Sequence, residues 1–204
     1  MDRLTLGHGD GADGNAVVSR TVASLAGGGV AAVPTETVYG LVTLWGNRPG
    51  RERIYALKRR PAEKHLQMLA ADLADAERAG LVSDDRIRRL AERCWPGPLT
   101  VVGRARGGGT VGVRVPAHAF VLELVRRLGE PLAATSANLS GRPPAATADA
   151  AVAELAGEPD VVVDGGAIDE GRASTVVSLA EAAEVELLRA GPYSLAFLRR
   201  VVGG

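Results

Sequence analysis

Apolar residues recur along the chain with two spacings, one typical of helices and one typical of buried strands. Helical spacing covers residues 15–26, 51–59, 73–93 with a break near Gly80, 119–129, 146–157 and 192–202. Short apolar runs predict strands over residues 30–34, 66–72, 99–105, 110–116, 131–135, 161–166, 174–180 and 185–191. The first fourteen residues predict a short strand followed by a loop.

Strands and helices alternate irregularly, and the strands cluster toward the end of the chain. This order favours an α/β fold with a twisted, mixed sheet flanked by helices over a strictly parallel Rossmann sheet. No linker, repeat or low-complexity stretch divides the 204 residues. We therefore expect a single domain over residues 1–204.

Several local signals refine these elements. Gly27 to Gly29 follow a helical stretch and offer a helix stop. Ser83 or Asp84 can cap the helix that follows. In the stretch 51–59 the helical spacing turns Ile54, Leu57 and Ala56 inward.

Composition narrows the partners and the compartment. Basic and acidic residues balance at 24 each, so no net charge draws the chain to nucleic acid or to an anionic membrane. The single cysteine, Cys94, rules out an intrachain disulfide and suits a reducing compartment. No signal-peptide pattern and no apolar run of about 20 residues is present. These features predict a cytoplasmic protein without a membrane partner.

Familiar catalytic and metal-binding signatures are missing from the sequence. There is no GxxxxGK[ST], HExxH, CxxC or GxSxG pattern, and no metal-ligand spacing, so we predict no protein-bound metal. The glycine-rich run 27–29 lies after a helix and before a strand, which is the reverse of a dinucleotide fingerprint.

Polar clusters instead follow several predicted strands, where ligands bind in open α/β sheets. Thr35, Glu36 and Thr37 follow one strand and can hold a small polar substrate or cap a helix. The cations of residues 58–64 can clamp phosphate or form a solvated helix end.

Later clusters leave similar alternatives open. Arg114 lies in an apolar strand and faces either a pocket with its anion or the solvent. His118 is a general base or a structural residue. Ser136 and Asn138 contact a ligand or form a turn. The cluster DEGRASTVV, residues 169–177, with Arg172, Ser174 and Thr175, and the later Arg189 also fit ordinary loops.

Taken together, the clusters form an ordered series: PTETVYGL, KRRP, WPGPLT, VRVPAH, TSANLSG, STVV and LLRAG. This series resembles the threonylcarbamoyl-AMP synthase family, also called YrdC-like, from about residue 33 to residue 192. The resemblance implies a YrdC-like fold with a large, concave, positively charged cavity. It also implies synthesis of threonylcarbamoyl-AMP from ATP, L-threonine and bicarbonate, with release of pyrophosphate.

The resemblance further implies roles for single residues. Thr35 and Arg114 match contacts to threonine, the latter to its carboxylate. Lys58 and Arg60 match ATP-phosphate contacts at the catalytic centre. The full set of residues that match ATP contacts is Lys58, Arg60, Thr110, Ser136, Asn138, Ser174 and Arg189. Mg²⁺ is expected to accompany ATP, and a partner enzyme to pass the product to adenosine 37 of tRNA, with weak tRNA binding by this chain.

The sequence also departs from the family pattern. His65 stands where many members have a proline, so no role is assigned to Lys64 or His65. LRAG replaces the common LRPG and leaves Arg189 intact. The closing helix near Gly204 suggests the short form of the family. Two other functions compete: a carbamoyl-transfer domain of hydrogenase maturation proteins, which the single cysteine disfavours, and a non-catalytic tRNA- or double-stranded-RNA-binding module.

Overall fold

The computed structural model describes residues 1–7, 12–168, 172–181 and 184–203. Its helices are α1 (Ala12–Ala26), α2 (Arg48–Lys58), α3 (Leu73–Arg78), α4 (Asp85–Cys94), α5 (Ala119–Leu128), α6 (Ala148–Ala153) and α7 (Leu195–Gly203). Its strands are β1 (Asp2–Thr5), β2 (Ala31–Val33), β3 (Gly40–Leu44), β4 (Gln67–Leu69), β5 (Leu81–Val82), β6 (Leu99–Ala105), β7 (Thr110–Arg114), β8 (Leu132–Ser136), β9 (Val161–Asp164), β10 (Thr175–Ser178) and β11 (Glu186–Arg189).

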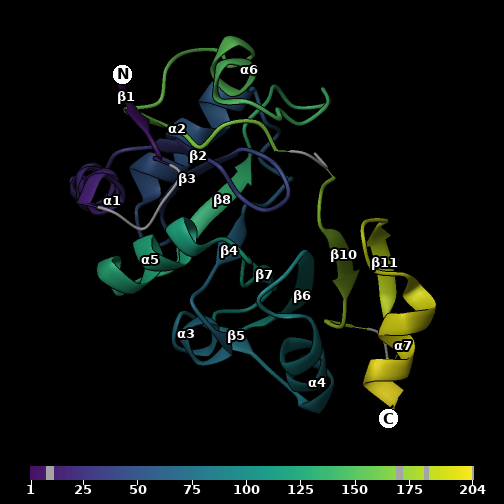
Figure 1. The fold of residues 1–204 in the computed structure, drawn as a ribbon. Helices are drawn as coiled ribbons and strands as arrows, with labels where there is room; N and C mark the ends of the chain where they lie inside the picture. The colour runs from purple at the N-terminus through teal and green to yellow at the C-terminus, as the bar shows by residue number, and fades with distance from the viewer. Residues whose placement is uncertain (8–11, 169–171, 182–183, 204) are drawn as a thin grey trace.

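All of these strands belong to one mixed sheet. Its order is β1-β9-β2-β3-β8-β4-β7-β6-β10-β11, with β5 paired to β6 outside this path. The pairs β1/β9, β2/β9, β4/β7 and β6/β10 are parallel, and the remaining pairs are antiparallel. The predicted mixed α/β sheet flanked by helices is therefore confirmed (Figure 1).

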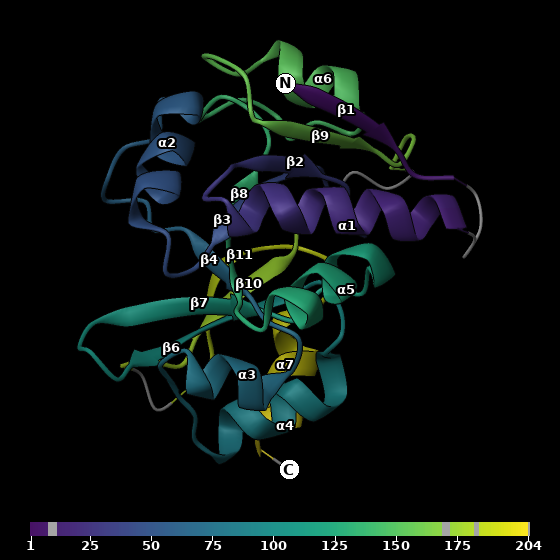
Figure 2. The ribbon, with the colours of Figure 1, turned by 90° about the vertical axis from the view of Figure 1, so that its left-hand side faces the viewer.

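One half of the sheet lies between two layers of helices. In sheet order it consists of β1, β9, β2, β3 and β8. Along these strands the side chains alternate, because successive residues of a strand point to opposite faces. Val161 and Val163 of β9 pack against α1 and α5, whereas Val162 packs on the side of α2 and α6. Figure 2 shows α1 and α5 side by side over one face of this half.

The other half is covered by helices on one face only. In sheet order it consists of β7, β6, β10 and β11. Val101, Val111, Val113 and Val177 turn to that face and pack with residues of α4 and α7, including Ile87, Leu90 and Leu198. The alternate residues of the same strands point the other way. Since none of the described helices covers them, this second face is open to form a site.

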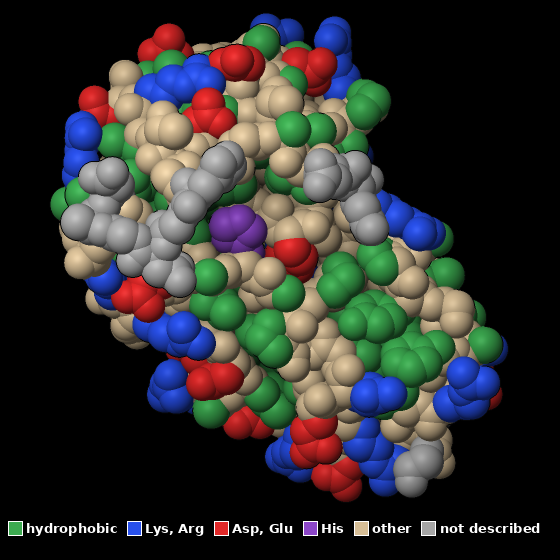
Figure 3. All heavy atoms as spheres, viewed as in Figure 1, with side chains coloured by type: hydrophobic (Ala, Val, Ile, Leu, Met, Phe, Trp, Pro, Cys, Tyr) green, Lys and Arg blue, Asp and Glu red, His purple; other side chains and the backbone are tan. Residues whose placement is uncertain are grey.

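The surface mixes charges of both signs. Acidic and basic side chains are interspersed at both ends of the face that Figure 3 shows, and neither sign forms a continuous patch there. This agrees with the balanced charge of the sequence. None of the described helices has both the length and the apolar character that a membrane crossing requires.

The structure corrects some predicted boundaries. The sequence reading missed β3 and β5, and it placed residues 12–14 in a loop, although α1 begins at Ala12. Strand β3 has the sequence GLVTL and is covered on both faces, with Leu41 in one hydrophobic cluster and Val42 in the other, so it lacks the alternation that marks a half-buried strand. Helix α6 is shorter than predicted, because Thr147 caps its start and the helix ends at Ala153.

Two predicted details of the helices are also settled. Asp84, rather than Ser83, caps α4 by accepting a hydrogen bond from the backbone N–H of Ile87. Ile54 and Leu57 of α2 are buried as predicted, but Ala56 is exposed. The prediction that Ala56 points inward is wrong because α2 buries only a narrow face, which contains Ile54 and Leu57 but not Ala56.

Candidate functional site

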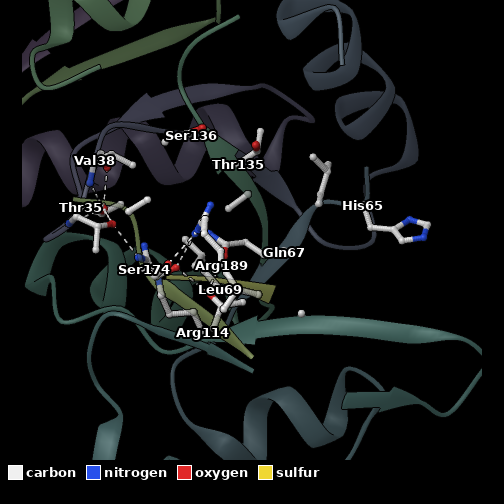
Figure 4. Close-up of a pocket in the computed structure, with 18 of the residues that line it drawn as sticks. Thr35, Val38, His65, Gln67, Leu69, Arg114, Thr135, Ser136, Ser174 and Arg189 are labelled. Atoms are coloured by element: carbon white, nitrogen blue, oxygen red, sulfur yellow. Dashed lines mark hydrogen bonds between the residues drawn. The ribbon is translucent and has the colours of Figure 1, made fainter. Parts of the chain in front are cut away.

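A cavity of about 410 Å³ lies on the open face of β6, β7 and β10. Strand alternation builds its floor: Thr100 and Val102 of β6, and Gly112 and Arg114 of β7, point into it, while their neighbours fill the core. The walls are formed by the end of β8, by residues 65–67 and by four residues of the turn before β3: Thr35, Thr37, Val38 and Gly40. Seven of the nine predicted site residues line this cavity: Thr35, Arg60, Thr110, Arg114, Ser136, Ser174 and Arg189. Figure 4 labels five of them: Thr35, Arg114, Ser136, Ser174 and Arg189.

The side chains that line the cavity include three cations, Arg60, Arg114 and Arg189. No Asp or Glu is among the described lining residues. Burial lowers the pKa of all three arginines from the ordinary value. Arg60 and Arg189 also repel each other, since the charge of Arg60 lowers the pKa of Arg189. Bringing such cations together is unfavourable without an anion, so the cavity is suited to a polyanionic ligand.

Arg114 is the most deeply buried of these arginines, with 3% of its side chain exposed. Its Nη1 donates a hydrogen bond of 2.8 Å to Thr37 Oγ1 and lies 3.7 Å from Glu36 Oε1. Its Nε has no hydrogen-bond partner. Of the two orientations that the sequence left open, the structure shows the one that faces the pocket.

Thr35 begins a tight turn between β2 and β3. Its Oγ1 accepts hydrogen bonds from the backbone N–H groups of Thr37 and Val38 and donates one of 2.7 Å to the carbonyl of Val38. The same oxygen lies 2.9 Å from Thr37 Oγ1. Because the turn leads into a strand, the interpretation of this segment as a helix cap is wrong. The turn holds both hydroxyls beside Arg114.

A chain of hydrogen bonds fixes Arg189 at the opposite wall. Its Nε donates to the carbonyl of Ser174 and its Nη2 donates to Ser174 Oγ, each at 3.0 Å. Ser174 Oγ lies 2.9 Å from Thr100 Oγ1, which donates to Gln67 Oε1 at 3.1 Å. Figure 4 shows Arg189 and Ser174 close to Arg114, with His65 standing apart. The chain of hydrogen bonds links β11, the residue before β10, β6 and β4.

The KRRP segment sends its cations in different directions. Arg59 ends α2 with a φ of 46°, the left-handed conformation that bends the chain away from the helix axis. Arg60 then reaches the cavity, where its Nε and Nη2 donate to the backbone carbonyls of Lys64 and His65. Arg59 and Lys64 are exposed, as a solvated helix end predicts, whereas Arg60 lines the cavity.

Lys58 lies behind the cavity wall and is 1% exposed. Its Nζ donates to the carbonyls of Ser136 and Asn138 and lies 3.5 Å from Asn138 Oδ1. Burial, with a smaller contribution from the charge of Arg60, lowers its pKa to about 8. Lys58 is not among the lining residues, so here it supports the 136–138 segment, and its contact with ATP stays a prediction.

Asn138 is also directed away from the cavity. Its Nδ2 donates to the carbonyls of Leu139 and Arg142, each at 2.8 Å, and it is 5% exposed. This is the turn interpretation that the sequence left open. Ser136, in contrast, lines the cavity at the end of β8. The predicted ATP contact of Asn138 remains a prediction.

Two functional candidates had no counterpart in the sequence analysis: Gln67 and Thr100. Each lines the cavity and hydrogen bonds to a predicted site residue or to its partner. Thr37, which the sequence named only as part of the 35–37 cluster, hydrogen bonds to Arg114. A hydroxyl inside the apolar run LTVV was the available signal for Thr100. His118 does not line the cavity; it precedes α5 without a side-chain capping bond, and burial lowers its pKa. Part of the 169–177 cluster, residues 169–171, lies outside the described residues.

The described part of the chain offers no ready metal site. No group of three or more His, Cys, Asp or Glu side chains is placed there to hold an ion. The cavity donors are guanidinium groups and hydroxyls, which suit phosphate and carboxylate oxygens rather than a bare cation.

Known proteins resemble this chain over most of its length. The threonylcarbamoyl-AMP synthase of Pyrococcus abyssi (strain GE5 / Orsay) is 38% identical over 185 residues, covering 86% of this chain and 54% of that protein. The threonylcarbamoyl-AMP synthase of Bacillus subtilis (strain 168) is 35% identical over 196 residues, covering 91% and 56%. The chain thus spans about half the length of these curated relatives.

A solved structure shares the fold and carries a ligand. The crystal structure of P. abyssi Sua5 complexed with L-threonine superposes with a TM-score of 0.86 at 31% identity, covering 99% of this chain and 60% of that one. Residues 23–191 match the Sua5_yciO_yrdC family model, whose description is "Telomere recombination". The chain therefore belongs to the Sua5/YciO/YrdC family.

Proposed function

We propose that this chain is a threonylcarbamoyl-AMP synthase, which condenses L-threonine, bicarbonate and ATP and releases pyrophosphate. The observation that carries the proposal is the cavity itself, where three arginines meet buried hydroxyl groups and no carboxylate lines the wall. A triphosphate beside a small amino acid supplies the anions that such a site lacks. The names of the relatives and the threonine bound to one of them support the same substrates.

The two substrates would occupy different ends of the cavity. Arg114, beside Thr35 and Thr37, would hold the carboxylate of threonine, since a guanidinium pairs with both oxygens of a carboxylate. Arg60 and Arg189, with Ser174, would neutralise the phosphates. The shared floor of β6 and β7 would bring the reacting groups together.

The chemistry would depend on positioning and charge neutralisation. The threonine nitrogen joins the carbon of bicarbonate with loss of water, and an oxygen of the resulting carbamate attacks the α-phosphorus of ATP. The bond to the β-phosphate oxygen breaks and pyrophosphate leaves, which makes the enzyme a nucleotidyltransferase. We expect no covalent intermediate with the protein. Mg²⁺ would arrive with ATP, held by phosphate oxygens and water.

The product would serve a second enzyme. The threonylcarbamoyl group would pass to adenosine 37 of tRNA through a partner enzyme in the cytoplasm, with weak tRNA binding by this chain. A non-catalytic RNA-binding module is the competing function. The interspersed charges of Figure 3 and the net charge of zero favour the enzyme.

The decisive experiment supplies ATP, radiolabelled bicarbonate and L-threonine to the purified chain. A labelled adenylate and an equal amount of pyrophosphate are expected. Arg60→Ala should lower kcat/KM by roughly 100- to 1000-fold, the cost of about one preorganised donor. Arg48→Ala, which removes an arginine whose side chain is 85% exposed, should leave the rate unchanged. Salt-dependent tRNA binding without any labelled adenylate would contradict the proposal.

A further inference from the structure

A cluster of buried polar atoms without hydrogen bonds lies around Arg114, which is part of the cavity floor. It consists of Glu36 Oε1 and Oε2, Arg114 Nε and His118 Nδ1. The only other such atom among the described residues is Glu154 Oε2. Buried polar groups are usually paired, so a concentration of unpaired ones marks a place that serves a purpose other than stability.

The geometry within this cluster is an ion pair without a hydrogen bond. Glu36 Oε1 lies 3.7 Å from Arg114 Nη1, beyond hydrogen-bond distance, and the Glu36 side chain is 17% exposed. Arg114 lines the cavity, but Glu36 does not. The carboxylate therefore acts on a ligand of Arg114 through its charge across a short distance, rather than by contact.

The other neighbours of this pair add no second negative charge among the described residues. Thr35 and Thr37 contribute uncharged hydroxyls beside Arg114. Burial holds the pKa of His118 below its ordinary value, so the imidazole adds no charge near neutral pH. Arg189 adds positive charge from the phosphate side, which lowers the pKa of Arg114. Glu36 is thus the anion that offsets this positive charge at the Arg114 subsite.

We propose that Glu36 is a specificity-determining residue, which makes the Arg114 subsite select a zwitterionic amino acid over a simple carboxylate anion. The inference rests on the proposed function, because it concerns the threonine end of the cavity. Glu36 repels any carboxylate that Arg114 attracts. A zwitterion offsets this repulsion, since its ammonium group lies in the same field and is attracted.

The test compares two ligands that differ only in the amino group. L-threonine is the zwitterion, and (R)-3-hydroxybutanoate is the anion without the amino group. Calorimetry gives the dissociation constant of each for the wild type and for Glu36→Gln. The ratio of the 3-hydroxybutanoate constant to the threonine constant should fall about tenfold in Glu36→Gln, as expected for one unit charge several ångströms away in a partly screened site. A general distortion of the pocket would weaken both ligands and leave the ratio unchanged.

Two control variants separate charge from shape. Glu36→Asp keeps the charge and should keep the ratio within about threefold of the wild type. Glu154 is the other carboxylate with a buried, unpaired oxygen, and its second oxygen lies 3.9 Å from Arg142 Nη1. Glu154 does not line the cavity, so Glu154→Gln should change neither dissociation constant.

The outcomes distinguish this inference from the proposed function. An unchanged ratio in a Glu36→Gln variant that still forms threonylcarbamoyl-AMP would overturn the inference alone. A wild type that binds both ligands equally would also overturn it, and this measurement holds even where Glu36→Gln does not fold. A wild type that neither binds threonine nor forms the adenylate would overturn the proposed function, and the inference with it.

Discussion

Neighbouring cations in this chain have different roles because their side chains point to different parts of the molecule. Lys58 and Arg60 are two positions apart, yet one supports a turn from behind and the other reaches the cavity. The family resemblance predicted both as phosphate ligands, whereas charge and spacing alone left a phosphate clamp and a solvated helix end open. The direction of each side chain depends on the left-handed conformation of Arg59, which no sequence pattern marked.

Lys58 should couple stability to pH. Its pKa is about 8 in the folded chain, against 10.5 for an unperturbed lysine. Between these values the unfolded chain binds more protons, so the contribution of Lys58 to the free energy of unfolding increases as pH rises. Denaturant titrations should therefore show that Lys58→Met is more destabilising at pH 10 than at pH 7.5. A pH-independent difference between the two proteins would show that the lysine titrates normally.

Cys94 should be inert in the folded chain. It is 2% exposed, and burial raises the pKa of its thiol to about 11. Because the thiolate is the reactive form, an aromatic disulfide reagent at pH 8 should modify the native protein at least about 100-fold more slowly than the denatured one. The unfolded chain serves as the control, since it carries the same single thiol. Equal rates would place the thiol at the surface.

At the scale of elements, strands whose apolar and polar residues alternate were predicted best. The strands β6 and β7 follow the predicted runs closely, and their alternation places Val111 and Val113 in the core and Arg114 in the cavity. The strand β3 escaped prediction because both of its faces are covered, so its sequence carries no alternation. The short strand β5 owes its place to pairing with β6, which is a tertiary contact.

The end of α2 offers a test at this scale. Arg59 adopts a φ of 46°, which favours glycine, and its side chain is exposed. Arg59→Gly should therefore raise the free energy of unfolding by about 0.5–1 kcal/mol. Urea denaturation measures the change. Arg48→Gly, inside the first turn of the same helix, is the matched control and should destabilise. Destabilisation by Arg59→Gly would mean that its side chain contributes contacts that outweigh the strain.

For the whole molecule, the site is assembled from segments far apart in the sequence. Thr35, Arg114 and Arg189 come from three regions that the sheet order brings to one hollow. The sequence indicated this convergence only through the family resemblance. The hydrogen-bond chain through Thr100 and Gln67 was not predictable, because it depends on strands that become neighbours only in the folded sheet.

Ligand binding should accordingly stabilise the entire fold and should depend on salt. Inorganic pyrophosphate supplies the phosphate charges without the reaction, and it should raise Tm in low salt more than in 0.5 M NaCl, because salt screens charge pairs. Arg189→Gln should reduce this shift in Tm. Arg20→Gln, an exposed arginine paired with Asp2 away from the cavity, should preserve the shift. A salt-independent shift would argue against binding by the arginines.

The strands that carry the cavity floor on one face carry a hydrophobic core on the other. Val113 packs beneath the floor immediately before Arg114, so trimming this apolar layer should shift the guanidinium above it. Substitutions of Val111 and Val113 should therefore change ligand affinity as well as stability, although neither valine lines the cavity.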